Sequence, residues 1–167
     1  MDEALLRSAN ALFGFSPPLW SLIDSPWAPL ALAAPLLWYF WKHGHLRWTL
    51  AVLVAVGLSD MTVVRGLKPM IGRERPCAVL EGVGVPVIDG SPHCGSGGAM
   101  PSAHASNTMA LAAVLASPEL AAVSFVVGAS RVVTGQHWPT DVLAGWGWGL
   151  ALGAAVRWGC KKGLGWR

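Results

Sequence analysis

The stretch SRVVTGQHWPTD, from Ser130 to Asp141, lies between two apolar runs and carries an arginine, a histidine and an aspartate. Both neighbouring runs have the composition of apolar helices, so the stretch marks a polar junction between two of them. Charge at the margin of a membrane segment is energetically costly, and it usually has a function or a partner there. What this junction does depends on the groups that the rest of the chain brings to it.

The composition predicts a membrane environment. Of the 167 residues, 53% are hydrophobic and 13% are charged, whereas soluble domains carry roughly 25% charged residues. Such a chain has too little polar surface to cover a soluble globule. The net charge of +3 is small, so we expect no nucleic-acid partner. The length predicts a single domain over residues 1–167.

The apolar runs predict an all-α fold, a polytopic transmembrane helix bundle with about five spans. The expected spans are residues 27–41, 48–66, 102–116, 120–134 and 139–158. An amphipathic helix over residues 2–15 is expected inside an interfacial N-terminal segment, residues 1–24. Its apolar face consists of Leu5, Leu6, Ala9, Leu12 and Phe13. The one long connection, residues 69–100, is rich in Gly and Pro.

Several of these segments are shorter than the roughly 20 residues that a span prefers. A compact soluble helical bundle is therefore the alternative. Tryptophan placement favours the membrane, because aromatic side chains gather at membrane interfaces. Tryptophans lie at segment ends, at Trp27, Trp41, Trp48, Trp138 and Trp158. Small residues suit close helix packing in lipid. The last segment has them at Gly145, Gly147, Gly149 and Gly153.

Alternating helix direction predicts that polar groups far apart in the sequence meet on one face of the membrane. The second span ends in RGLKPMIGRERP, the third begins at PSAH, the fourth ends at Arg131 and the fifth begins after His137. If these helices alternate in direction, all four ends emerge together. The resulting cluster contains several cations, two histidines, a serine and a carboxylate.

This cluster has the groups needed to hold a doubly charged anion with several oxygens. Lys68, Arg75 and Arg131 can surround it, the arginines through paired hydrogen bonds. Ser102 is placed as the N-cap of a helix. The backbone N–H groups that follow it, beginning at Ala103, would point at the anion with the help of the helix dipole.

The histidines supply the reactive groups. His137 and Asp141 are four positions apart across a helix start, and a carboxylate on one ring nitrogen leaves the other nitrogen free to attack. His104 is suited to protonating a leaving oxygen. The reaction that these parts describe is phosphoryl transfer to a histidine, with cations and N–H groups stabilising the phosphoryl oxygens.

Three motifs in order give a resemblance to a known family. They are KPMIGRERP (Lys68 to Pro76), PSAH (Pro101 to His104) and the opening stretch SRVVTGQHWPTD. They resemble the K-x6-R-P, P-S-G-H and S-R-x5-H-x3-D motifs of the type 2 phosphatidic acid phosphatase (PAP2) family. The resemblance covers the chain from Lys68 to about Gly145.

The resemblance implies a PAP2-like membrane phosphatase that hydrolyses a lipid phosphate or pyrophosphate through a phosphohistidine. It implies that His137 is the nucleophile, Asp141 its partner and His104 the general acid. The implied phosphate-binding residues are Lys68, Arg75, Ser102, Ala103 and Arg131. We expect no cofactor and no metal, because the chain itself supplies the cations that neutralise the phosphate.

Two features depart from the family pattern. Ala103 stands where the motif has glycine. Alanine serves if the position needs only its backbone N–H, and adds strain if the position needs a positive φ; we favour the first reading. The chain is also short, since family members commonly have six spans and the first is here missing or replaced by the amphipathic segment.

The expected partners are a lipid phosphate substrate and membrane lipids. Candidate substrates are undecaprenyl pyrophosphate, slightly favoured, phosphatidylglycerophosphate, phosphatidic acid and a lipid A 1-phosphate. The alternatives are a lipid phosphotransferase that uses the same site and a non-catalytic lipid-binding membrane protein. Vanadium haloperoxidases share the motif set but are soluble, which disagrees with the apolar segments. The sequence leaves the oligomeric state unknown.

Two polar residues inside the expected spans are harder to interpret. Asp60 lies about two turns inside the second span, where an unpaired carboxylate is costly. It either bridges helices or orients a group of the site, and we favour the structural role. Asn107, one turn after His104, either braces the site or binds another helix.

Some polar residues outside the motif positions are expected to have no catalytic role. Arg73 and Glu74 occupy free positions of the first motif and are interpreted as an exposed loop pair. His43 and His45 have no third ligand nearby, so we expect no metal site there.

The sequence predicts only weakly which side of the membrane the site faces. Each face carries six cations, so the positive-inside rule does not decide by itself. Discounting the three cations expected to bind phosphate favours a cytoplasmic C-terminus and an extracytoplasmic site in a bacterial inner membrane. Cys77 and Cys94 bracket the loop on the site face, and a disulfide between them would suit an oxidising compartment. The alternative is two free thiols.

Overall fold

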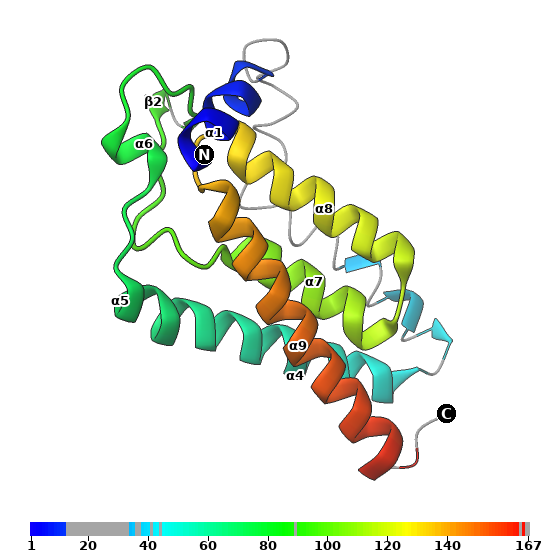
Figure 1. The fold of residues 1–167 in the computed structure, drawn as a ribbon. Helices are drawn as coiled ribbons and strands as arrows, with labels where there is room; N and C mark the ends of the chain where they lie inside the picture. Colours follow the sequence, from blue (N-terminus) through cyan, green and yellow to red (C-terminus); the bar gives the residue numbers. More distant parts are fainter. Residues whose placement is uncertain are drawn as a thin grey trace.

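The computed structural model describes residues 1–12, 34–35, 38–40, 42–43, 45–88, 90–163 and 165. Most of the first expected span and Phe13 lie outside these residues. The described chain is largely helical (Figure 1). Its elements are α1 (Asp2–Asn10), α4 (Leu46–Met61), the π-helix η2 (Thr62–Leu67), α5 (Lys68–Ile71), α6 (Pro76–Val79), β1 (Val87–Ile88), β2 (Ser91–Pro92), α7 (Ala103–Leu115), α8 (Pro118–Val133) and α9 (Pro139–Gly163).

The expected spans 48–66, 102–116, 120–134 and 139–158 all correspond to helices, and the last helix continues five residues further, to Gly163. Local sequence explains where they begin. Ser117 precedes α8, and its Oγ accepts the N–H of Leu120 at 3.2 Å. Pro139 opens α9, as expected from its fixed φ. Asp141 reaches back from the first turn of α9 to accept the N–H of Trp138 at 2.8 Å.

α7 is the central helix of the described bundle and contacts α4, α8 and α9 (Figure 1). The α7–α9 contact is close because glycines face α7. A Cβ atom at Gly149 would overlap the carbonyl oxygen of Ser106, and Gly145 and Gly153 are similarly hemmed in by the α7 backbone. Gly147 has nothing within 4 Å of such an atom. The predicted close packing is therefore confirmed for three of the four glycines.

The long connection between α5 and α7 has structure of its own. The short helix α6 begins it, and β1 and β2 form an antiparallel pair with Val87 opposite Pro92. The expectation of an all-α fold is thus correct for the bundle but not for this loop. A disulfide joins Cys77 to Cys94, with their Cα atoms 5.9 Å apart, which confirms the predicted bridge.

The N-terminal helix differs from the expected amphipathic helix. It ends at Asn10 rather than near residue 15. Leu6 is fully buried against α7, α8 and α9 residues, whereas Leu5 and Leu12 are exposed, so the expected five-residue apolar face does not form one buried surface. Asn10 donates to the carbonyl of Val133 at 2.6 Å. These contacts attach α1 to the protein, beside the end of α8 and the start of α9 (Figure 1).

Within the described part of the chain, only the stretch Leu46–Val79 is long enough to span a membrane and contains an 18-residue window that is apolar enough, with a mean hydropathy of 1.7. The expected number of five spans therefore stays a prediction. Other helices still present large apolar side chains outward, among them Phe125, Val126, Leu143 and Leu150. Exposed apolar surface of this kind suits contact with lipid.

Candidate active site

A pocket of about 180 Å³ lies where α5 ends, α7 begins, α8 ends and the chain turns into α9. It is lined by Lys68, Arg75, His93, Gly95, Ala103, His104, Arg131, Gln136 and His137. Ser102 and Asp141 are fully buried next to lining residues. All the site residues predicted from the sequence thus converge.

The π-helix η2 determines where Lys68 points. It continues α4 without a break and ends directly before Lys68. Because π-type hydrogen bonds span five residues rather than four, this segment rotates everything after it relative to α4. In that orientation the Lys68 side chain is 9% exposed and lines the pocket.

Arg75 is held by hydrogen bonds to the surrounding chain. Its Nη1 donates to the carbonyl of Gln136 at 3.0 Å and to Nε2 of His137 at 3.3 Å. Its Nε and Nη2 donate to the carbonyls of Gly97 and Ser96 at 3.3 and 3.4 Å. Since a guanidinium only donates, Nε2 of His137 must accept, and the neutral imidazole carries its proton on Nδ1.

His137 and Asp141 face each other inside the protein. Nδ1 of His137 lies 3.6 Å from Oδ2 of Asp141, slightly beyond hydrogen-bond length. The imidazole is 2% exposed. Burial lowers the pKa of His137 from 6.5 to about 4; the carboxylate of Asp141 opposes this shift and nearby Arg75 reinforces it. His137 is therefore neutral at pH 7, with the lone pair of Nε2 on the pocket side.

The start of α7 forms another wall of the pocket. Ser102 is the N-cap by position, as expected, yet its side chain makes no capping bond, and its buried Oγ has no partner among the described residues. Its backbone N–H donates to the carbonyl of Asp141 at 2.9 Å, which ties α7 to α9. Ala103 is the first helical residue and does not have a positive φ, so alanine fits this position without strain. His104 is exposed at the pocket.

Residues 48–162 match the model of the PAP2 superfamily. The chain belongs to this superfamily. A lipid A 4'-phosphatase of Bacteroides thetaiotaomicron is 28% identical in an alignment 163 residues long, and the match covers 87% of this PAP2 chain and 70% of that protein.

Solved structures show the same PAP2 fold. A transmembrane PAP2-type phosphatidylglycerolphosphate phosphatase from Bacillus subtilis aligns with a TM-score of 0.73 and 23% identity, over 96% of this chain and 85% of that one. LpxE from Aquifex aeolicus aligns with a TM-score of 0.70 and 23% identity, over 92% of both chains. The family resemblance stated from the motifs is thereby confirmed.

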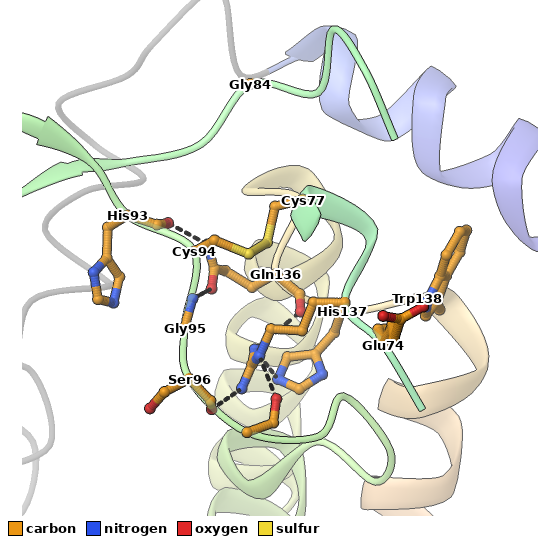
Figure 2. The surroundings of a disulfide bond; sticks show 12 residues. Glu74, Cys77, Gly84, His93, Cys94, Gly95, Ser96, Gln136, His137 and Trp138 are labelled. Atoms are coloured by element: carbon orange, nitrogen blue, oxygen red, sulfur yellow. Dashed lines mark hydrogen bonds between the residues drawn. A yellow bond between two sulfur atoms is a disulfide. The ribbon is translucent and has the colours of Figure 1, made fainter. Parts of the chain in front are cut away.

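Gln136 is a residue of this PAP2 site that the sequence analysis missed. It is 5% exposed. Its Oε1 accepts the N–H of Gly95 at 2.9 Å and its Nε2 donates to the carbonyl of His93 at 2.7 Å. Figure 2 shows these bonds on both sides of Cys94, so side chain and disulfide together hold the loop beside His137. In the sequence, only the position of Gln136 next to His137 indicates that it belongs to the site.

Arg73 corrects a second interpretation. Rather than forming an exposed pair with Glu74, it makes ion pairs of 2.8 Å with Asp141 and with Asp2. Glu74 is exposed, and its carbonyl accepts the indole N–H of Trp138 at 2.9 Å. The sequence did offer a signal for this role, because Arg73 is a charged residue inside a motif of a chain that has few charges.

Asp60 makes a bond between helices, as the structural interpretation expects, and its choice between that role and orienting a group of the site stays a prediction. Its Oδ1 accepts the side-chain N–H of Asn107 at 2.9 Å, which joins α4 to α7 outside the pocket lining. Among the described residues, no group of three or more His, Cys, Asp or Glu side chains is placed to hold a metal ion.

Proposed function

We propose that this PAP2 protein is a membrane phosphatase that hydrolyses a lipid phosphate or pyrophosphate through a phosphohistidine on His137. The observation that carries the proposal is the placement of its Nε2. This neutral, accepting nitrogen lines a pocket that also contains Lys68, Arg75 and Arg131, each no more than 9% exposed. Buried cations around a neutral nucleophile suit attack on a phosphorus atom.

In the proposed first step the phosphate binds to the three cations and the unpartnered Oγ of Ser102. Its oxygens replace His137 as the acceptor for Arg75, which frees the Nε2 lone pair. Nε2 then forms a bond to phosphorus while the bond from phosphorus to the lipid oxygen breaks. His104 gives its proton to that leaving oxygen.

In the second step a water molecule attacks the phosphohistidine. His104, now unprotonated, takes a proton from this water as the new P–O bond forms and the N–P bond breaks. Inorganic phosphate leaves, and Nε2 regains its lone pair. The Nδ1 proton stays on the side of Asp141 throughout, so the carboxylate stabilises the positive charge that develops on the ring. We propose that no metal takes part in either step.

The substrate class is supported by the surroundings and by the relatives. Apolar side chains around the helices suit a lipid that approaches from the side. One relative is named for a lipid A phosphate and another for phosphatidylglycerolphosphate. A panel of these two lipids, phosphatidic acid and undecaprenyl pyrophosphate, assayed for phosphate release in detergent, ranks the candidates.

The nucleophile is tested by His137→Ala. We expect phosphate release to fall by more than about a thousandfold, while vanadate still binds because the three cations remain. His45→Ala, a matched change at an exposed histidine, should retain activity. Near-normal turnover in His137→Ala would contradict the assignment. Activity that chelation abolishes and added magnesium or zinc restores would contradict metal independence.

We further propose that the site faces the extracytoplasmic side of the inner membrane. The disulfide between Cys77 and Cys94 supports this orientation, since such bonds persist in oxidising compartments. The proposal keeps residues 1–167 as one PAP2 domain, with the loop 69–100 on the extracytoplasmic side.

A further inference from the structure

Arg73 connects the buried acid of the site to the helix at the other end of the described chain. Its Nη1 donates to Oδ1 of Asp141 at 2.8 Å and to Oγ1 of Thr140 at 2.6 Å. Its Nη2 donates to Oδ2 of Asp2 at 2.8 Å. The guanidinium carbon also lies 5.1 Å from the centre of the Trp138 ring. One planar group therefore spans two carboxylates over an aromatic face.

The two oxygens of Asp141 have separate partners. Oδ1 accepts from Arg73, and Oδ2 accepts the N–H of Trp138 at 2.8 Å while facing Nδ1 of His137 at 3.6 Å. The carboxylate is fully buried, so its charge must be compensated inside the protein. Arg73 compensates it on the side away from the imidazole and leaves Oδ2 turned toward His137.

Asp2 holds Arg73 from the other side. Its Oδ1 accepts the backbone N–H of Thr140 at 3.3 Å, and its Oδ2 accepts the Thr140 hydroxyl. Burial alone would raise the pKa of Asp2, but the hydrogen bonds from Thr140 and Arg73 outweigh it and lower the pKa. Asp2 is therefore an anion at neutral pH, placed at the positive N-terminal end of α9.

We propose that Arg73 and Asp2 are positioning residues, which together hold the Asp141 carboxylate in the orientation where Oδ2 faces His137. The inference rests on the proposed function, because it gives the network a role in the reaction of His137. A chain of polar contacts then runs from α1 through the loop after α5 to the nucleophile.

Only arginine suits this position. Its fork supplies two nitrogens in one plane, one for each carboxylate, whereas a lysine ammonium is a single point that cannot reach both in the same way. A purely structural role, fixing α1 to the bundle, would predict a different result. It would lower stability and leave each folded molecule fully active.

Arg73→Gln and Arg73→Lys separate these roles in steady-state kinetics. We expect both variants to lower kcat by about 10- to 100-fold, the usual effect of losing a group that orients a reacting side chain. KM and the dissociation constant of vanadate should change less than about threefold, because Lys68, Arg75 and Arg131 keep their places. Wild-type kcat in either folded variant would overturn the proposal.

A double-mutant cycle tests whether Asp2 acts through Arg73. Asp2→Ala should lower kcat in the same direction, and Asp2→Ala combined with Arg73→Gln should lose little more than Arg73→Gln alone. Glu3→Gln is the matched control, because Glu3 pairs with Arg7 on the exposed face of α1; it should leave kcat unchanged. Fully additive losses in the double variant would contradict a shared network.

The titration of the His137 ring, followed by NMR in labelled protein, gives a readout that does not depend on turnover. We expect Arg73→Gln to raise the pKa of His137, because the charge of Asp141 then acts on the imidazole with less compensation. Charged or titratable groups face His137 from every neighbouring element: Lys68, Arg75, His104, Arg131 and Asp141.

The NMR result also separates the two proposals. If the wild-type protein releases no phosphate from any lipid of the panel, the proposed function fails, yet a shifted His137 titration in Arg73→Gln still supports the positioning network. In an active wild-type protein, an unchanged kcat or an unchanged His137 titration in folded Arg73→Gln overturns the network and leaves the proposed function intact.

Discussion

His137 is neutral in the fold because it is buried, and this makes the folded state sensitive to acid. Its pKa is about 4 in the folded protein, compared with 6.5 for an exposed histidine. Between these two pH values the unfolded chain binds a proton that the folded chain does not, so stability falls as the pH falls through this window. At roughly 1.4 kcal/mol per pKa unit, the loss is about 3–4 kcal/mol.

We therefore expect His137→Asn to lose less stability than the wild-type protein on acidification through this window, in thermal melts recorded in detergent. Asparagine has no proton to gain there, so the difference isolates the imidazole. His45→Asn, at an exposed position, should follow the wild type. Identical pH dependence in His137→Asn and wild type would show that His137 is not buried as a neutral ring.

At the scale of elements, the contact between α7 and α9 determines the distance between the proposed catalytic groups. α7 begins beside Ser102 and α9 carries Asp141, and Gly149 lets the two backbones approach. A methyl group at Gly149 pushes against the carbonyl of Ser106. We expect Gly149→Ala to destabilise the protein by about 1–3 kcal/mol and to lower kcat, because the start of α7 moves away from α9.

Gly147→Ala is the matched control for this prediction. The site has nothing within 4 Å of an added Cβ atom, so the same substitution should be neutral or stabilising by up to about 1 kcal/mol, the helix-propensity difference. Melting temperature and kcat of the two variants, measured side by side, check the prediction. Equal effects of both substitutions would mean that the helices are not in backbone contact at Gly149.

At the scale of the whole molecule, the disulfide links stability to orientation in the membrane. The bridge joins residues 17 positions apart, and closing a loop of that length stabilises by about 3 kcal/mol in the chain-entropy model. We expect Cys77 and Cys94 to be resistant to alkylation in intact cells with an oxidising periplasm, and Cys77→Ser to lower the melting temperature. Complete alkylation of both thiols in such cells would contradict the extracytoplasmic site.

The convergence of the site could be predicted from sequence because it depends only on the order and direction of apolar runs. Alternation brings Lys68, Arg131 and His137 to one face whatever the details of packing. The contacts of Arg73 and Gln136 depend instead on the path of the loop after α5 and on the docking of α1. Those features arise between segments distant in sequence, and no local pattern encodes them.

The helical period explains why the expectation of close packing at all four glycines of α9 is wrong for one of them. Gly145, Gly149 and Gly153 are four apart and share a face, whereas Gly147 lies between them on the other side of α9. The spacing in the sequence therefore already places Gly147 on another face than the other three glycines. The four share only their small size, and size alone does not predict which face of the helix each one occupies.

The π-helix before Lys68 has opposite consequences for stability and for the proposed activity. A π segment amounts to an extra residue inserted in a regular helix, usually kept where function requires it. Deleting one residue between Thr62 and Leu67 would restore regular α-helical bonding and turn Lys68 away from the pocket. Laboratory evolution toward thermostability alone would therefore tend to discard this irregularity, and the more stable descendants would have lost a proposed phosphate ligand.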